Sequence, residues 1–286
     1  MRLNPFNPGS INVRRSGGGG GFPGGGGGQL GCGAIVIALI GVFVFGADPA
    51  QMLGSMEGAQ QGAPQQEQPG GESAAEICDD NQYATESCNA LASLNQTWQP
   101  IFQQAGIEFT QPALVFYSGA VRSGCGSASS AAGPFYCPSD QSMYIDTSFY
   151  DQLNRQLGAG PGDFARYYVI AHEYGHHVQA LTGVADQIRS LQQQNPRRAN
   201  QLSVMMELQA DCYAGVWAGK NRNAIEPGDF EEGMQAAQAI GDDTLTGGRV
   251  GAENFTHGTS AQRMQALRLG MESGNDLQCD RIVEVG

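Results

Sequence analysis

A five-residue run, His172-Glu173-Tyr174-Gly175-His176, limits the structures open to this chain more than any other part of it. The chain has four histidines in 286 residues, and three of them lie at positions 172, 176 and 177. Residues four apart on an α-helix lie on the same face, so a helix here would direct His172 and His176 at one point. Glu173 would lie beside that point, where a carboxylate can take a proton from metal-activated water. The run therefore predicts a helix that carries a catalytic zinc site.

The residues around this run also favour a helix. Apolar side chains precede it at helical spacing, Asp163 is a residue type that caps helices, and Gly183 suits a helix end. The alternative interpretation is a helix whose two histidines make ordinary hydrogen bonds and whose Glu173 faces solvent.

A catalytic zinc needs a third protein ligand and an open fourth position. A second predicted helix, over 202–219, carries Glu207 and Asp211 on one face among apolar or small residues. Acids on such a face are costly unless they meet a cation or hydrogen-bond donors. We therefore expect Glu207 to bind the zinc and Asp211 to accept the free ring N–H of a ligating histidine. In the alternative, both acids face solvent or pair with nearby arginines, namely Arg197, Arg198 or Arg222.

Two segments, 172–179 and 207–215, resemble the bacterial putative neutral zinc metallopeptidase family. Shorter similarities lie at 133–138, 144–146, 162–165 and 256–258. The resemblance extends over residues 76–286 and includes a Gly-rich start and one membrane span. It implies one zinc ion bound by His172, His176 and Glu207, with Glu173 as the general base.

The fourth histidine, His257, lies in a predicted loop that leads into a helix. In related peptidases with an E-x-x-x-D motif, a similar stretch with a histidine and a following arginine lies near the active site. That similarity implies a catalytic role for His257, which can donate to the oxyanion, and oxyanion support from Arg263. The alternative is a loop histidine bonded to nearby backbone and an arginine in a surface ion pair.

The hydrophobic pattern predicts a helix-rich α+β domain with a small sheet, and the resemblance to the metallopeptidase family implies a zincin-like core. Helices are expected over 77–106, 163–182, 202–219, 230–240 and 261–271, and strands at 114–117 and 143–145. The segment 142–147 could present an exposed strand edge to an extended peptide substrate. An ordinary internal strand is the alternative.

The N-terminal region predicts attachment to a membrane. Glycine runs within residues 1–28 cannot build a core, so we expect a disordered tail there. Residues 30–47 contain no charged side chain, and Asp48 ends this stretch. The stretch is about long enough for one bilayer span. The tail contains arginines and no acid, which by the positive-inside bias puts it in the cytoplasm.

We therefore expect a transmembrane signal anchor at 29–47, a flexible Gln/Gly/Pro-rich linker at 48–75 and a metallopeptidase domain at 76–286. The chain would cross the bacterial inner membrane once, with the catalytic domain in the periplasm. A cleaved signal peptide is the alternative, but the long segment before the apolar stretch is atypical of one.

Six of the seven cysteines follow the expected span, and the seventh, Cys32, lies within it. An even set in an oxidising compartment predicts disulfides, for which fifteen connectivities exist. Proximity favours two local pairs and leaves a third that ties the second zinc helix to the C-terminus. The expected pairs are Cys78–Cys88, Cys125–Cys137 and Cys212–Cys279. The competing interpretation, a cysteine-ligated zinc, lacks a C-x-x-C pair.

The formal net charge is −13, and the acids lie in the part expected to be exported. Such a surface argues against nucleic acid partners. The expected partners are a protein or peptide substrate and the membrane. The sequence thus predicts a membrane-anchored zinc metallopeptidase of envelope proteins. The alternative from another class is a zinc-stabilised binding or regulatory module without activity, although structural zinc sites usually have four protein ligands.

Overall fold

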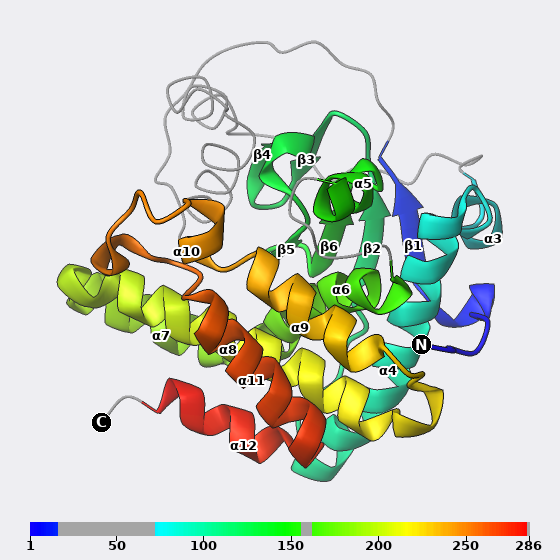
Figure 1. Cartoon of the computed structure of the whole chain (residues 1–286). Helices are drawn as coiled ribbons and strands as arrows, with labels where there is room; N and C mark the ends of the chain where they lie inside the picture. Colours follow the sequence, from blue (N-terminus) through cyan, green and yellow to red (C-terminus); the bar gives the residue numbers. More distant parts are fainter. Residues whose placement is uncertain (17–71, 156–161, 285–286) are drawn as a thin grey trace.

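The computed structural model describes residues 1–16, 72–155 and 162–284, and these form a helix-rich α+β fold with small sheets (Figure 1). The predicted fold class is confirmed at this level. Within the described ranges, no helix is both long enough and apolar enough to cross a membrane. The predicted anchor at 29–47 and nearly all of the predicted linker at 48–75 lie outside these ranges.

The helices correspond to the predicted pattern, with additional short ones. Their bounds are α3 (Ala74–Cys78), α4 (Gln82–Ala105), α5 (Ser148–Arg155), α6 (Asp163–Leu181), α7 (Val184–Gln194), α8 (Ala199–Lys220), α9 (Asp229–Ala239), α10 (Asp242–Leu245), α11 (Ser260–Ser273) and α12 (Asp276–Asp280). The predicted helix over 77–106 is interrupted, because α3 ends at Cys78 and the side chain of Asn81 caps a new helix by accepting from Ala84 N–H.

One mixed sheet has the strand order β1-β2-β6-β5, and a separate hairpin joins β3 to β4. The bounds are β1 (Asn12–Arg15), β2 (Ala113–Phe116), β3 (Ala120–Ser123), β4 (Gly126–Ser129), β5 (Phe135–Cys137) and β6 (Ser142–Ile145). β1 and β6 both run parallel to β2, whereas β5 pairs antiparallel with β6 at the end of the sheet.

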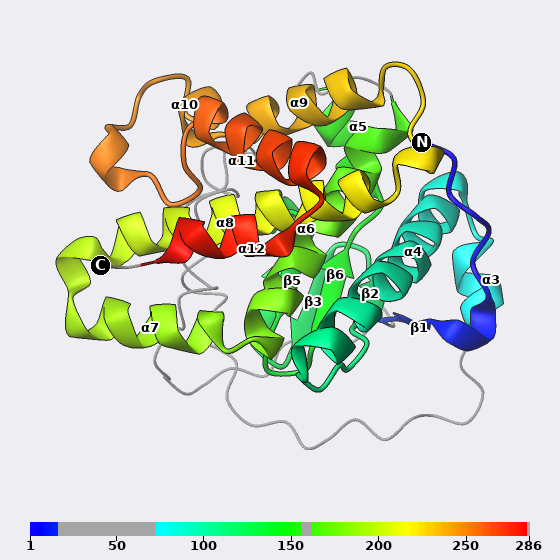
Figure 2. The same ribbon diagram turned by 90° about the horizontal axis from the view of Figure 1, so that it is seen from below.

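The two faces of this sheet contribute to different hydrophobic clusters. Leu114, Phe116, Met143 and Ile145 belong to the main core with α4 and α6, which lie alongside the sheet in Figure 2. Tyr144 of the opposite face belongs to a smaller cluster with residues of β3 and β5. This arrangement follows from the alternation of side chains along a strand, and it explains why β2 is buried on both faces.

The N-terminal segment departs from the prediction. Residues 1–16 are not a disordered tail, because β1 pairs with β2 over four residues and Arg2 N–H donates to Ala224 O at 2.7 Å. Met1 is only 3% exposed, and its amino group lies 2.8 Å from Asp163 Oδ1 at the start of α6. Residues 1–16 therefore belong to the sheet of the folded domain, and residues 17–28 of the predicted tail lie outside the described ranges. The predicted location of the chain stays a prediction.

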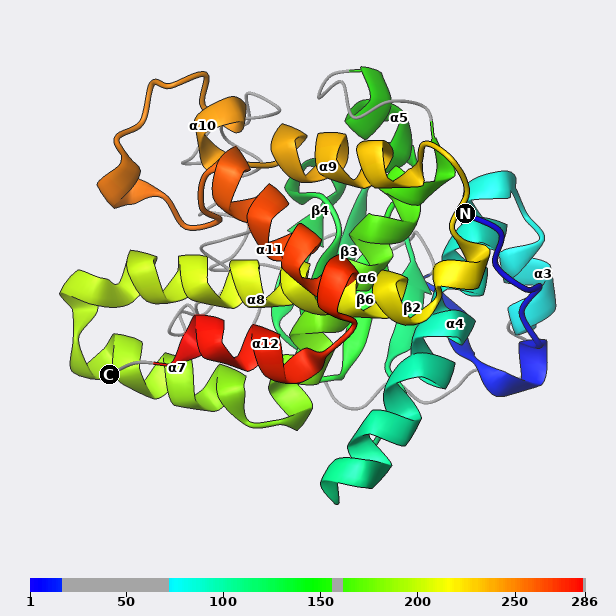
Figure 3. The same cartoon turned by 60° about the horizontal axis from the view of Figure 1, so that its bottom comes forward.

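All three predicted disulfides are present. Cys78–Cys88 joins α3 to α4, and Cys125–Cys137 joins the β3–β4 turn to β5. Cys212–Cys279 ties α8 to α12. Figure 3 shows α8 in the middle of the helical layer, where it contacts α6, α7, α11 and α12. The helix that carries Glu207 is thus held on several sides.

Candidate metal centre

Three side chains from two helices converge on one point. His172 and His176 come from α6, and Glu207 comes from α8. The Nε2 atom of His172 lies 3.2 Å from Glu207 Oε2, and that of His176 lies 3.4 Å from Glu207 Oε1. Ligand atoms of the three residues all lie within 4.8 Å of one another. The structure thus brings together the three residues that the sequence assigned to zinc.

A glycine allows the two helices to approach this closely. A Cβ atom on Gly175 would lie 2.8 Å from both Cα and O of Ala210 on α8. Any larger residue at position 175 would therefore push α6 away from α8. Gly175 precedes His176 directly, and Ala210 lies between Glu207 and Asp211, so this contact sets the spacing of the three converging side chains.

The remaining nitrogen of each histidine already has a partner. His172 Nδ1 lies 2.8 Å from Asp211 Oδ1, and His176 Nδ1 lies 2.8 Å from Gln179 Oε1. Carboxylate and amide oxygens only accept hydrogen bonds, so both rings donate from Nδ1. Their Nε2 lone pairs then face the oxygens of Glu207. Facing lone pairs repel unless a cation or a proton lies between them, and this observation fits a metal site.

The electrostatics of the metal-free chain agree with this interpretation. Burial by itself would lower the pKa of His172, but the carboxylates of Asp211 and Glu207 raise it to about 10. Burial would raise the pKa of Glu207, but His176 and His172 hold it well below its usual range. Protons thus compensate the buried negative charge, a role that a divalent cation can take over. Two imidazoles and one carboxylate are a donor set of catalytic zinc sites, so these residues fit zinc.

Asp211 organises the side of His172 that faces away from Glu207. Its Oδ1 accepts from His172 and from the hydroxyl of Tyr168, and both of its oxygens accept from Arg263 at 2.8 and 2.9 Å. Asp211 is fully buried and Arg263 is 2% exposed. Burial would raise the pKa of Asp211, but Arg263 and His172 lower it. Asp211 therefore remains a carboxylate that orients the ring of His172.

Arg263 is the counterion of Asp211. Its guanidinium donates to both oxygens of Asp211, to Tyr168 at 3.4 Å and to Ile240 O at 3.3 Å. Its Nη2 also lies 3.2 Å from His172 Nδ1 and 3.8 Å from Glu207 Oε2. The predicted oxyanion support by Arg263 stays a prediction.

Glu173 is buried at 9% exposure and makes no hydrogen bond or ion pair with any other described residue. Burial raises its pKa above the ordinary value, although the nearby histidines oppose the increase. A carboxylate with a raised pKa and unshared oxygens is suited to accept and release a proton near neutral pH.

The strand predicted to present an exposed edge lies inside the sheet. β6 is paired on both sides, with β2 and with β5, so the edge belongs to β5. Tyr136 of β5 lies with its hydroxyl 2.9 Å from His177 Nδ1, and His177 Nε2 lies 2.7 Å from Thr110 O. Since the carbonyl only accepts, His177 donates from Nε2 and accepts from Tyr136. This contact attaches β5 to α6 beside the metal-binding group.

Two of these contacts were not predicted, although the sequence contains a signal for each. Tyr168 lies four residues before His172 and Gln179 lies three residues after His176, so helical spacing puts each on the face of its histidine. Polar residues on this apolar helix could have been tested as partners of the histidines.

His257 makes no hydrogen bond to the three converging residues in the part of the chain that the structure describes. It is 3% exposed, and its Nδ1 lies 2.9 Å from Asp242 Oδ1. Its ring thus bonds to a side chain and not to nearby backbone, and Arg263 is buried and not in a surface ion pair. The catalytic role of His257 stays a prediction.

The fold and the site together define a helix-rich α+β protein with a His-His-Glu group between two helices that is suited to hold a metal ion. Residues 6–282 match the family described as "Putative neutral zinc metallopeptidase", and the chain belongs to this family. The predicted family membership is thus confirmed.

Similar proteins carry no assigned function. The chain is 51% identical over 196 residues to "Uncharacterized protein YpfJ" of Escherichia coli K12, which covers 66% of this chain and 68% of the relative. It is 41% identical over 211 residues to "Uncharacterized protein Rv2575" of Mycobacterium tuberculosis H37Rv, covering 68% and 69%. No solved structure matches the chain.

Proposed function

We propose that this protein is a zinc-dependent peptidase that hydrolyses peptide bonds of extracytoplasmic or envelope proteins. The observation that carries the proposal is the convergence of His172, His176 and Glu207 next to Glu173, a buried carboxylate without a partner in the described structure. A site that served only to stabilise the fold would be expected to have a fourth protein ligand and would not need a free carboxylate beside it.

The residues of the chain have separate tasks in this reaction. When bound, zinc supplies a Lewis acid that polarises the scissile carbonyl and makes water more acidic. Glu173 takes a proton from the attacking water as its oxygen bonds to the carbonyl carbon, and delivers that proton to the leaving amine as the C–N bond breaks. Asp211 and Gln179 keep the rings of His172 and His176 in the ligating orientation.

The edge of β5 is the proposed position of the substrate backbone. An extended peptide can add to a free sheet edge through main-chain hydrogen bonds, and β5 ends the sheet next to α6. The hydrogen bond from Tyr136 to His177 would keep this edge at a fixed distance from the metal ligands.

Three disulfides support a location outside the cytoplasm, because such bonds persist in oxidising compartments. We therefore propose that the catalytic domain acts in the cell envelope. Since β1 belongs to its sheet, residues 1–16 would lie in the same compartment.

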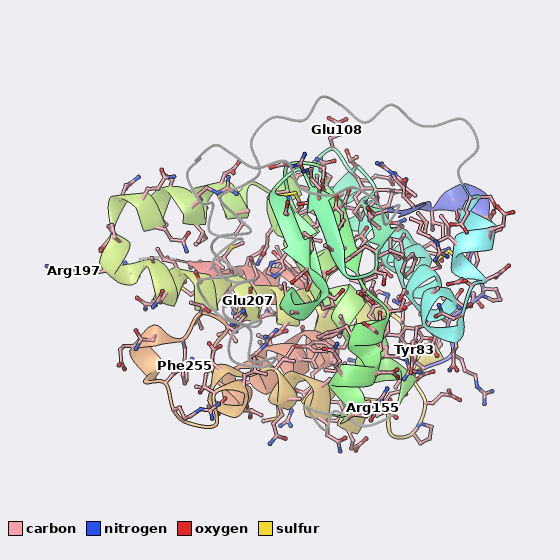
Figure 4. All side chains as sticks on the ribbon, turned by 90° about the horizontal axis from the view of Figure 1, so that it is seen from above. Tyr83, Glu108, Arg155, Arg197, Glu207 and Phe255 are labelled. Carbon is pink, nitrogen blue, oxygen red and sulfur yellow. A yellow bond between two sulfur atoms is a disulfide. The ribbon has the colours of Figure 1, made fainter. Side chains whose placement is uncertain are left out.

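The test compares the full chain with Glu173→Gln, measuring zinc content and the cleavage of a fluorescently labelled unfolded protein. Glu108→Gln is the matched control, because Glu108 is exposed and lies far from Glu207 (Figure 4). We expect both variants to bind one zinc per chain and only Glu173→Gln to lose kcat/KM, by about 10²- to 10⁴-fold.

Two results would count against this proposal. A zinc-loaded wild-type protein that cleaves neither unfolded proteins nor a broad peptide library would favour the non-catalytic module. If Glu207→Ala still bound zinc as the wild type does, the assignment of Glu207 as a zinc ligand would be wrong.

A further inference from the structure

The carboxylate of Asp242, the first residue of α10, holds the loop that contains His257. Its Oδ2 accepts from the backbone N–H groups of Thr256 (2.8 Å), His257 (2.7 Å) and Gly258 (3.1 Å), and its Oδ1 lies 2.9 Å from His257 Nδ1. Asp242 is 8% exposed. One buried carboxylate therefore fixes both the backbone of this loop and the ring of its histidine.

This contact determines which nitrogen of His257 is available. Because an ionised carboxylate only accepts hydrogen bonds, the Nδ1 of His257 carries a proton. The opposite nitrogen, Nε2, is buried and has no hydrogen-bond partner among the described residues. Buried polar atoms without partners are rare in folded proteins, so we infer that Nε2 is positioned for a group that binds from outside the chain.

The loop lies against the helix that supplies Glu207. A Cβ atom on Gly258 would lie 3.1 Å from Val204 and 3.5 Å from Leu208, which precede and follow Glu207 on α8. Figure 4 shows Phe255, two residues before His257, on the same side of the molecule as Glu207. From the helix that follows the loop, Arg263 reaches to 3.8 Å from Glu207 Oε2. The loop that carries His257 thus packs on α8 and leads into α11, and both helices have residues next to the metal-binding group.

We propose that Asp242 is a positioning residue for the peptidase reaction, which orients His257 so that Nε2 meets the substrate beside the metal-binding group. This inference rests on the proposed function. In the doubly protonated ring, Nδ1–H stays with Asp242 and Nε2–H donates to the oxyanion that forms from the scissile carbonyl. The negative charge of Asp242 balances the positive charge of that ring.

The substitution Asp242→Asn separates the two tasks of this carboxylate. The amide oxygen of asparagine can still accept from the three backbone N–H groups, which keeps the loop in place. Its NH2 group would then face His257 Nδ1 and, as a donor, would move the ring proton to Nε2. The variant ring could still donate from Nε2, but only as a neutral imidazole, because it has lost the anion that balances the positive charge of the doubly protonated ring. Asp243→Asn is the matched control, because Asp243 bonds to Ser260 and makes no hydrogen bond to His257.

We measure kcat and KM of the zinc-loaded full chain and the ¹⁵N resonances of the His257 ring, assigned by their loss in His257→Ala. We expect His257→Ala to lower kcat by about 10²- to 10³-fold and Asp242→Asn to lower it by about 10- to 100-fold with little change in KM. The double variant is expected to be no slower than His257→Ala by more than about twofold, since Asp242 acts through His257. The resonances should report protonated Nδ1 in the wild type and in Asp243→Asn, and protonated Nε2 in Asp242→Asn.

Distinct results would overturn this inference. An unchanged kcat in Asp242→Asn would show that Asp242 does not act through His257. The same conclusion would follow if Asp242→Asn lowered kcat in the His257→Ala variant by as much as it does in the wild type. A wild-type ring without a proton on Nδ1 would refute the orientation itself. Absence of cleavage by the zinc-loaded wild type would instead refute the proposed function, while the ring resonances would still report whether Asp242 orients His257.

Discussion

Replacement of Gly175 by alanine tests whether the contact between α6 and α8 sets the geometry of the metal site. The added Cβ would lie 2.8 Å from backbone atoms of Ala210, whereas ordinary contact begins at 3.4 Å. The helices must therefore separate by about 0.6 Å. Ligand distances in metal sites are met to within about 0.2 Å, so this displacement exceeds what the ligand set tolerates. We expect zinc affinity to fall at least about tenfold, which corresponds to about 1.4 kcal/mol.

The effect of Gly175→Ala on folding is the balance of two opposing contributions. Alanine is better than glycine in a helix interior by about 1 kcal/mol, whereas overpacking of a core costs about 1–3 kcal/mol. The free energy of unfolding of the metal-free chain should therefore fall by no more than about 2 kcal/mol.

The assay combines a chelator competition for zinc affinity with urea unfolding of the metal-free chain. Gly215→Ala is the control, because its Cβ would lie 2.2 Å from Leu267 O on α11 and would disturb a helix contact outside the α6–α8 pair. We expect Gly215→Ala to lose stability without the same loss of intrinsic zinc affinity. Wild-type zinc affinity in Gly175→Ala would refute the reasoning.

Three further predictions follow from individual contacts. Asp211→Asn should lower the free energy of unfolding by about 3–5 kcal/mol, because it leaves the buried guanidinium of Arg263 without its nearest anion; a urea titration that shows less than about 1 kcal/mol would contradict this. Gln179→Ala should weaken zinc binding about 10- to 100-fold by freeing the Nδ1 of His176, and unchanged affinity in the chelator competition would assign Gln179 to packing alone. Cysteines placed at the exposed positions Ser10 and Gln103 should react alike with a membrane-impermeant thiol reagent in intact cells, because β1 and β2 share one sheet; labelling of only one would contradict the position of β1.

Several expectations that came from local pattern agree with the structure, whereas the span predicted at 29–47 lies outside the described residues. The helix around His172 and the helix around Glu207 follow from apolar residues at helical spacing, which is a property of each segment alone. The pairs Cys78–Cys88 and Cys125–Cys137 followed from short separations along the chain. Local spacing could therefore predict which side chains share a face of one helix.

The expectations that failed concern contacts between distant segments. Composition predicted a disordered start, but β1 gains order by pairing with a strand about a hundred residues later. Of the two possibilities left open for β6, a free edge or an internal strand, the second is correct, because β5 pairs with it. The partner of a strand cannot be predicted from the sequence of that strand, since each strand needs only a β-prone run.

The sequence by itself determined that two histidines four residues apart and a neighbouring glutamate share one helix, whatever that helix packs against. Tertiary structure alone decided that Glu207 reaches them, since this depends on α6 and α8 meeting where Gly175 faces Ala210. It also decided the partners of each ring, from Asp211 behind His172 to Asp242 beside His257. A helix repeats every 3.6 residues and can be recognised from its own sequence, whereas a crossing of two helices depends on the shapes of both.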